Sequence, residues 1–165
     1  MRRQSAFEEL WIWERVGDRL PWYYAVATNR MPAKYRIAAR VPVDVDLAAD
    51  EKALWDAHDA ATGVFLDFWG EIRGGERRIH DLPRADPSLL DLSAELARRM
   101  LRHCDFCRWN CCVDRVTGTK HGACQLGSVS RVSSYFHHMG DELVLRGTRG
   151  SGTIFFTSCN LRCVY

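Results

Sequence analysis

Hydrophobic residues in the first hundred positions recur at the three- and four-residue steps of amphipathic helices. The clearest run begins near Asp50 and stops at Gly74-Gly75, because glycine is a strong helix terminator. Another run begins after Asp86-Pro87, a suitable cap and first-turn proline, and reaches about His103. On their inward faces the two predicted helices carry Leu54, Ala57, Ala61, Val64, Phe65, Phe68, Trp69 and Ile72, then Leu89, Leu92, Leu96 and Met100.

The stretch before Asp50 has a weaker pattern. Ser5 and Glu8 have the spacing of a capping box, so a helix should begin there, and Pro21 and Pro32 interrupt the pattern that follows. Residues 35–43 contain enough β-branched side chains to predict a short strand or an extended arm. We therefore expect residues 1–103 to form a mostly helical region.

Helical periodicity is lost at Cys104. Residues 104–127 are rich in cysteine and lack a regular hydrophobic pattern, which indicates a segment organised by its thiols. Two short runs further on, at 131–136 and 153–157, predict strands. The expected fold class is α/β, with a helical region at 1–103, a cysteine-rich metal-binding segment at 104–127 and a strand-containing region at 128–165.

Composition fits a soluble globular protein, since 47% of the 165 residues are hydrophobic and 27% are charged. Acidic residues occur before any apolar stretch at the N-terminus, and no segment is long enough to cross a bilayer, so we expect a cytoplasmic protein without membrane partners. Residues 1–97 hold 13 Lys or Arg and 17 Asp or Glu (−4), whereas residues 98–165 hold 10 and 4 (+6). The basic part suits thiolates, an anionic cluster or substrate, or nucleic acid, and charge alone does not choose between them.

All seven cysteines lie in this basic part. Their odd number and the absence of a secretion signal argue against a disulfide framework and for metal or redox chemistry. The spacing Cys104-x2-Cys107-x3-Cys111, followed by Cys124, supplies soft ligands for zinc or an iron–sulfur cluster. The alternative is that some of these cysteines are buried apolar residues, and we interpret the neighbouring Cys112 as an inert thiol.

Residues 150–165 resemble the opening of the radical S-adenosylmethionine (SAM) core, in which a first strand leads into a C-x3-C-x2-C loop. Cys159 and Cys163 match the first two cysteines of that loop, and Tyr165 matches the aromatic residue before the third. The resemblance implies that the chain is an N-terminal fragment that ends inside this motif, at the start of a truncated partial (β/α) barrel in residues 128–165.

The upstream cysteine segment is similar to the pyruvate formate-lyase activating enzyme branch of that family. The similarity includes Cys104 to Arg115, then Gly122-Ala123-Cys124, and an element from His138 to Glu142 that resembles a His-x-Gly-Glu-Glu pattern with Asp141 in place of the first glutamate. Two departures stand out, because Cys112 and Ser158 both replace a glycine that is usual in the family.

The resemblance implies a function. Cys159 and Cys163, with a third cysteine, would hold a 4Fe-4S cluster whose open iron binds SAM, and Tyr165 would lie near SAM. A low-potential donor such as flavodoxin or ferredoxin would supply the electron that cleaves SAM to a 5′-deoxyadenosyl radical, which could activate a glycyl-radical protein substrate. The fragment contains no catalytic residue of its own and is expected to be inactive alone. Cys104, Cys107, Cys111 and Cys124 would hold an auxiliary cluster or zinc.

An alternative needs no SAM chemistry. The upstream cysteines and the basic bias would also suit a non-catalytic zinc-ribbon-like module that binds protein or nucleic acid, although nucleic acid is the less favoured partner. Metal analysis separates the two hypotheses, because labile sulfide indicates a cluster and stoichiometric zinc without iron indicates a structural site.

Overall fold

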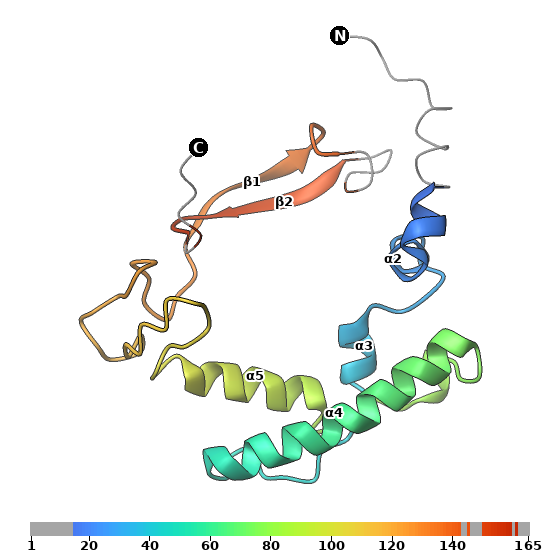
Figure 1. Cartoon of the computed structure of the whole chain (residues 1–165), viewed down its shortest axis with the longest axis horizontal. Helices are drawn as coiled ribbons and strands as arrows, with labels where there is room; N and C mark the ends of the chain where they lie inside the picture. Colours follow the sequence, from blue (N-terminus) through green and yellow to red (C-terminus); the bar gives the residue numbers. More distant parts are fainter. Residues whose placement is uncertain (1–14, 143–144, 146–149, 160, 162–165) are drawn as a thin grey trace.

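The computed structural model describes residues 15–142, 145, 150–159 and 161. Helices α3, α4 and α5 pack on one another, and strands β1 and β2 form a hairpin that the cysteine-rich segment joins to α5 (Figure 1). Residues 15–19 are helical, and the predicted helix start at Ser5 lies outside the described residues. The elements are α2 (Pro21–Ala27), α3 (Lys34–Ala38), α4 (Glu51–Gly74), the short 3-10 helix η1 (Ile79–Asp81), α5 (Leu89–Met100), β1 (Val132–His138) and β2 (Ser151–Phe156).

The long helix α4 has the limits that its end signals predict. The Asp50 side chain accepts a hydrogen bond from the Ala53 backbone N–H at 2.9 Å, which satisfies one of the N–H groups left open in the first turn. Gly75 follows the helix with a φ of 81°, the left-handed conformation in which glycine commonly closes a helix. Both predicted ends of this helix are confirmed.

Helix α5 starts later than predicted. Ser88, and not Asp86-Pro87, is its N-cap, because the Ser88 hydroxyl accepts from the Asp91 N–H while Asp91 accepts from the Ser88 N–H. This reciprocal capping box satisfies two open donors at once, which the Asp86-Pro87 pair does not do here. The helix ends at Met100, earlier than the predicted His103.

The strand or extended arm predicted for residues 35–43 is wrong in its first half. Lys34–Ala38 forms helix α3, and Ile37 on it is completely buried. The chain is extended only afterwards, where Pro42 forms an antiparallel bridge with Ser88. Ile37 and Val41, four residues apart, are both completely buried. Tertiary packing therefore overrides the preference of the β-branched residues for a strand.

The hydrophobic core lies between α3, α4 and α5. Most predicted inward positions are buried or partly buried, but Val64 is 39% exposed and does not belong to the core. One core cluster consists of Val41, Val43, Leu54, Ala61, Leu89, Leu92 and Leu96, and the other of Ile37, Ile72, Ile79 and Leu82.

The hairpin contains both predicted strands, with limits shifted by one or two residues. β1 and β2 are antiparallel, with Val132 opposite Phe156 and His138 opposite Ser151. Within the described residues this is a two-stranded sheet, so the partial barrel expected from the resemblance stays a prediction. Among the described helices, none combines the length and apolar character that crossing a membrane requires.

Candidate metal centre

The cysteine-rich segment begins where α5 ends and is folded by its own backbone. Cys104 donates its N–H to the Val113 carbonyl at 3.1 Å, and Cys112 donates its N–H to the Cys104 carbonyl at 2.9 Å. These two hydrogen bonds close a loop that contains Cys107. The Arg115 N–H then donates to the Leu101 carbonyl at 2.8 Å, which fixes the loop to the end of α5.

The hairpin returns the chain to this segment. Because β1 begins at Val132 and β2 ends at Phe156 opposite it, antiparallel pairing places residues 128–130 beside residues 158–159. The Thr157 N–H extends the pairing by donating to the Arg131 carbonyl at 2.8 Å. Cys159 therefore comes back to the upstream cysteines, although it lies 35 positions after Cys124 in the sequence.

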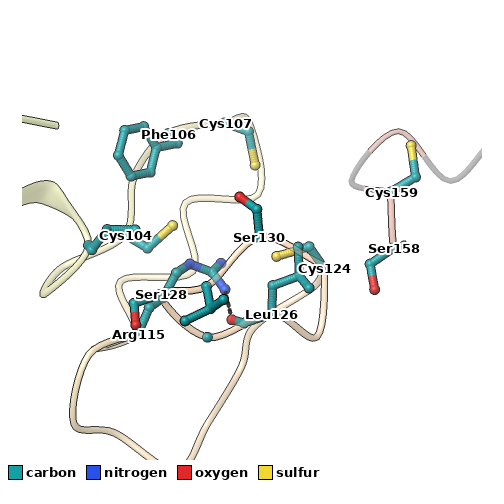
Figure 2. A pocket seen from close by; sticks show the side chains of 13 residues that line it. Cys104, Phe106, Cys107, Arg115, Cys124, Leu126, Ser128, Ser130, Ser158 and Cys159 are labelled. Carbon is teal, nitrogen blue, oxygen red and sulfur yellow. Dashed lines mark hydrogen bonds between the residues drawn. The ribbon is translucent and has the colours of Figure 1, made fainter. Parts of the chain in front are cut away.

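Four cysteines line one cavity of about 340 Å³ at this junction. Figure 2 shows the sulfur atoms of Cys104, Cys107 and Cys124 around the Arg115 side chain, with Cys159 to one side. Cys104 is buried, Cys107 and Cys124 are half-buried, and Cys159 is exposed; the six described cysteines form no disulfide. The remaining lining residues are Leu101, Phe106, Arg115, Leu126, Gly127, Ser128, Val129, Ser130 and Ser158.

Cys111, the remaining predicted upstream ligand, does not line the cavity but lies next to it. Its sulfur accepts the Ala123 N–H at 3.3 Å, and a Cβ atom on Gly122 would lie 2.9 Å from that sulfur. Cys112 is exposed, and its thiol lies 3.3 Å from the side-chain oxygen of Asn110. The interpretation of Cys112 as an inert thiol stays a prediction.

Arg115 is the charged residue buried at the centre of this segment, with 7% of its surface exposed. Its guanidinium donates to the His121 carbonyl at 2.8 Å and to the Leu126 carbonyl, a contact drawn in Figure 2. A hydrogen bond to the Cys104 sulfur raises the pKa of Arg115 above its usual value, and charge interactions with Cys104 and Cys124 act in the same direction, although burial opposes them. Arg115 therefore stays a cation beside the thiols.

The donor set fits a thiolate-binding metal in kind. Cysteine sulfur suits zinc and iron–sulfur clusters, and backbone N–H groups already point at the sulfurs of Cys111 and Cys159, the latter from Leu161 at 3.4 Å. However, no three His, Cys, Asp or Glu side chains in the described ranges are placed to hold a single ion. The Arg115 guanidinium lies between Cys104 and Cys124 (Figure 2). Binding a metal ion would therefore require the cysteine sulfurs to move closer together than they are here.

The residues predicted to bind a SAM cluster are described only in part. Cys159 follows Ser158, whose φ is 66°, so the backbone turns sharply just before the thiol. Cys163 and Tyr165 lie outside the described residues.

The element from His138 to Glu142 lies at the opposite end of the hairpin from the cavity (Figure 1). There, His138 Nδ1 is 2.7 Å from Asp141 Oδ1, and the Ser151 hydroxyl donates to the other oxygen of Asp141. The structure thus gives this element a local role in closing the hairpin end.

Sequence reasoning missed two features of this site. It treated Cys159 as belonging to a site separate from Cys104, Cys107 and Cys124, whereas all four line one cavity. It also included Arg115 in a motif without assigning it a role. The signal was an arginine four residues after Cys111, but only its burial reveals its significance.

Comparison with known proteins adds little about chemistry. No protein-family model matches the chain, and no solved structure matches it. The chain is 34% identical over 147 residues to a protein of Methanocaldococcus jannaschii described as "Uncharacterized protein MJ0674"; the match covers 89% of this chain and 40% of that relative. The chain thus spans about two fifths of the length of this relative. Only 18 of the 165 residues of this chain fall outside the match. Wherever the match begins, it therefore includes residues 19–147, which contain the upstream cysteine segment.

Proposed function

We propose that this chain carries the start of a radical SAM iron–sulfur protein, similar to the pyruvate formate-lyase activating enzyme branch. The observation that carries the proposal is Cys159 in the loop directly after strand β2, followed by Cys163 at the spacing of the family motif. Cys159 and Cys163 would hold the cluster and Tyr165 would lie near SAM. When bound, the cluster and SAM would supply the reductive cleavage that yields a 5′-deoxyadenosyl radical.

The loop after β2 is suited to presenting a ligand. Loops that follow strands build the active sites of α/β barrels, and Cys159 is three residues beyond the end of β2 at Phe156. Its sulfur already accepts the Leu161 N–H, a bond that would stabilise a thiolate. The chain's own residues would therefore position and orient the sulfur before any cluster arrives.

The hairpin has apolar surface that is suited to packing against further strands or helices. Its apolar side chains are exposed, with Tyr135 79% and Phe156 59% accessible. A two-stranded hairpin is marginally stable alone, and exposed apolar surface of this kind favours packing against further strands or helices. This supports the proposal of a larger barrel, and the relative contains more sequence than the match covers.

Cys104, Cys107, Cys111 and Cys124 are proposed to hold a second metal centre, either iron–sulfur or zinc. Support comes from the cavity that three of them line and from the N–H donor at Cys111. The same observation favours the second candidate function, a zinc-ribbon-like module without SAM chemistry. In that case Cys159 would be a neighbour of the zinc site and not a cluster ligand.

One experiment separates these proposals. The gene product, including any sequence that the gene encodes after Tyr165, is purified without oxygen, reconstituted with iron and sulfide, and analysed for iron, sulfide and zinc. It is then given SAM and dithionite, and 5′-deoxyadenosine is measured. We expect product from the unchanged protein and from Cys112→Ala, the matched control, but none from Cys159→Ala or Cys163→Ala.

Product from Cys159→Ala would refute its assignment as a cluster ligand. Stoichiometric zinc, no labile sulfide and no product from the unchanged protein would instead support the zinc module. The physiological electron donor, proposed to be flavodoxin or ferredoxin, can then replace dithionite in the same assay.

A further inference from the structure

We propose that a cavity of about 360 Å³ in the helical region binds a small organic phosphate monoester. The cavity lies where the connection between α2 and α3 meets the loop that follows α4 (Figure 1). Its volume is near the lower end of the range for small-molecule sites, roughly 300–1,000 Å³. This ligand site is separate from the cysteine-rich segment and depends on neither a metal centre nor SAM chemistry.

The lining of this cavity is rich in arginine. Four arginines contribute to it, Arg30, Arg36, Arg77 and Arg78, together with His80. In the described part of the chain, no acidic side chain lines the cavity. This concentration of positive charge is unexpected by composition, because residues 1–97 carry 13 Lys or Arg and 17 Asp or Glu, a balance of −4. Planar guanidinium groups match the oxygens of phosphate, so an arginine cluster of this kind favours a phosphate ligand.

Two of the four arginines have no carboxylate partner. Arg77 pairs with Glu71 at 2.5 Å, and Arg78 pairs with a carboxylate of the same loop at 3.2 Å. Among residues that the structure describes, no carboxylate pairs with Arg30 or Arg36. The cavity therefore has two positive charges to be balanced. A phosphate monoester supplies about −1.5 to −2 at neutral pH, which is the charge required.

Neutral groups hold the guanidinium of Arg30 in place. Its Nε donates to the Thr28 hydroxyl at 3.0 Å, and the group lies over the Tyr24 ring, 4.6 Å from its centroid. Within the described ranges, the Nη groups of Arg30 form no hydrogen bond, so they are available to phosphate oxygens. Arg30 is therefore positioned by its neighbours without being neutralised by them.

The backbone fixes the walls that carry these arginines. After α2, the Arg30 N–H donates to the Ala25 carbonyl at 2.7 Å, and after α4 the Arg77 N–H donates to the Glu71 carbonyl at 3.3 Å. Both loops thus fold back on the helix that they follow, as helix C-termini commonly do. A site formed by fixed loops loses little conformational entropy when a ligand binds.

Arg40 joins the two walls, although it does not line the cavity. Its Nε donates to the Ile79 and Leu82 carbonyls at 3.1 and 3.0 Å, and its Nη1 donates to the Arg36 carbonyl at 2.9 Å. The backbone that carries Arg36 is therefore held to the loop on the other side of the cavity. This contact keeps the arginines of both walls at one site.

The cavity also has an apolar floor. Ile72 and Ile79 line it and are only 3% and 7% exposed, and Pro32 beside them is buried. Inorganic phosphate gains nothing from apolar surface, whereas the organic part of a phosphate monoester is stabilised by covering it. The acidic balance of the surrounding region disfavours nucleic acid, a polyanion that would be repelled outside the cavity. These features together favour a small organic phosphate.

The test measures binding of phenyl phosphate to the full gene product by isothermal titration calorimetry at low salt. Phenyl phosphate combines a phosphate dianion with an apolar ring, and inorganic phosphate and benzyl alcohol each supply one of these features. We expect one phenyl phosphate per chain, bound about 10-fold more tightly than inorganic phosphate because its ring covers apolar surface. Benzyl alcohol should not bind measurably. Added salt should weaken phenyl phosphate binding, since the arginines are partly exposed.

Substitutions locate the site. Arg30→Gln and Arg36→Gln should each weaken phenyl phosphate binding about 10-fold, the usual effect of losing one charge-assisted hydrogen bond. Arg73→Gln is the matched control, because it removes the same charge from the exposed last turn of α4 without touching the cavity lining. Its affinity should stay within about twofold of the unchanged chain, since a distant exposed charge is screened. Far-UV circular dichroism verifies that each variant is folded.

Four outcomes would overturn the proposal. Absence of binding to the unchanged chain would remove the site, and an equal loss in Arg73→Gln would show attraction by overall charge alone. Inorganic phosphate binding as tightly as phenyl phosphate would exclude recognition of the organic part. A phosphoserine peptide or an oligonucleotide that binds more tightly would assign the cavity to a macromolecule. None of these results bears on the SAM proposal, which 5′-deoxyadenosine production decides.

Discussion

Gly122 and Cys111 pack so closely that a side chain on Gly122 would start 2.9 Å from the Cys111 sulfur. Gly122 also has a φ of 62°, in the left-handed region that favours glycine. The Gly122-Ala123-Cys124 turn can therefore return to the first cysteines only because position 122 has no side chain. This relationship gives a physical reason for a glycine two residues before Cys124.

We expect Gly122→Ala to displace Cys111 and to reduce metal retention at the upstream site. Gly127→Ala is the matched control in the same segment, because its Cβ would meet only the Arg115 carbonyl oxygen at an ordinary 3.6 Å. Bound metal per chain is measured after purification without oxygen and brief dialysis against a chelator. Equal retention by the two variants would show that this close approach is not required.

Cys112 and Ser158 replace glycines that are usual in the family proposed for this chain, and both have left-handed φ angles, 51° and 66°. For an L-residue this conformation costs roughly 1–2 kcal/mol. Cys112→Gly and Ser158→Gly should each therefore raise the free energy of unfolding by about 1 kcal/mol, measured by urea denaturation under reducing conditions. Cys112→Ala keeps the strained backbone without the thiol and should give no gain; a gain there would indicate that the thiol, not the backbone, is unfavourable.

Local signals were sufficient for part of the fold. Asp50 and Gly75 mark the ends of α4 because capping and left-handed closure depend on the residues at those positions alone. The start of α5 was predicted two residues early because Asp86-Pro87 and Ser88 are both good start signals, and only the reciprocal bonds with Asp91 distinguish them. Ile37 is helical because it packs between distant segments, which periodicity over nine residues cannot reveal.

The candidate site was predictable by residue type but not by arrangement. The spacing of Cys104, Cys107 and Cys111 predicts a metal site; the structure brings Cys104 and Cys107 to one cavity and Cys111 beside it, and metal binding stays a prediction. That Cys159 shares their cavity depends on the antiparallel register of Val132 with Phe156, a long-range pairing that no local pattern specifies. The burial of Arg115 among the cysteines was not predictable either, because a buried arginine has the same sequence signature as an exposed one.

Leu92 is completely buried where α5 packs against α4. We expect Leu92→Ala to lower the free energy of unfolding by about 2–5 kcal/mol, because it removes apolar contacts and leaves a cavity. Leu66→Ala on α4 is the control; its side chain is 52% exposed, so its effect should stay within about 0.5 kcal/mol. Urea denaturation followed by far-UV circular dichroism measures both, and equal effects would contradict the core described for these helices.

The capping box of α5 predicts a specific dependence of stability on pH. Hydrogen bonds from the Ser88 hydroxyl and from the Ser88 N–H lower the pKa of Asp91 in the folded chain. Because the folded pKa is below the unfolded value of about 3.9, this carboxylate stabilises the fold fully above that pH. Its contribution is lost as the pH falls from about 4 through the folded pKa. Asp91→Asn should therefore be less stable than the unchanged chain at pH 7, and the difference should shrink toward pH 2.

Ser88→Ala should lower the free energy of unfolding by about 1 kcal/mol at pH 7, since it removes the hydroxyl that caps the helix. Urea denaturation at several pH values checks both variants, and an Asp91→Asn difference that stays constant from pH 7 to pH 2 would contradict a stabilising role for the ionised carboxylate.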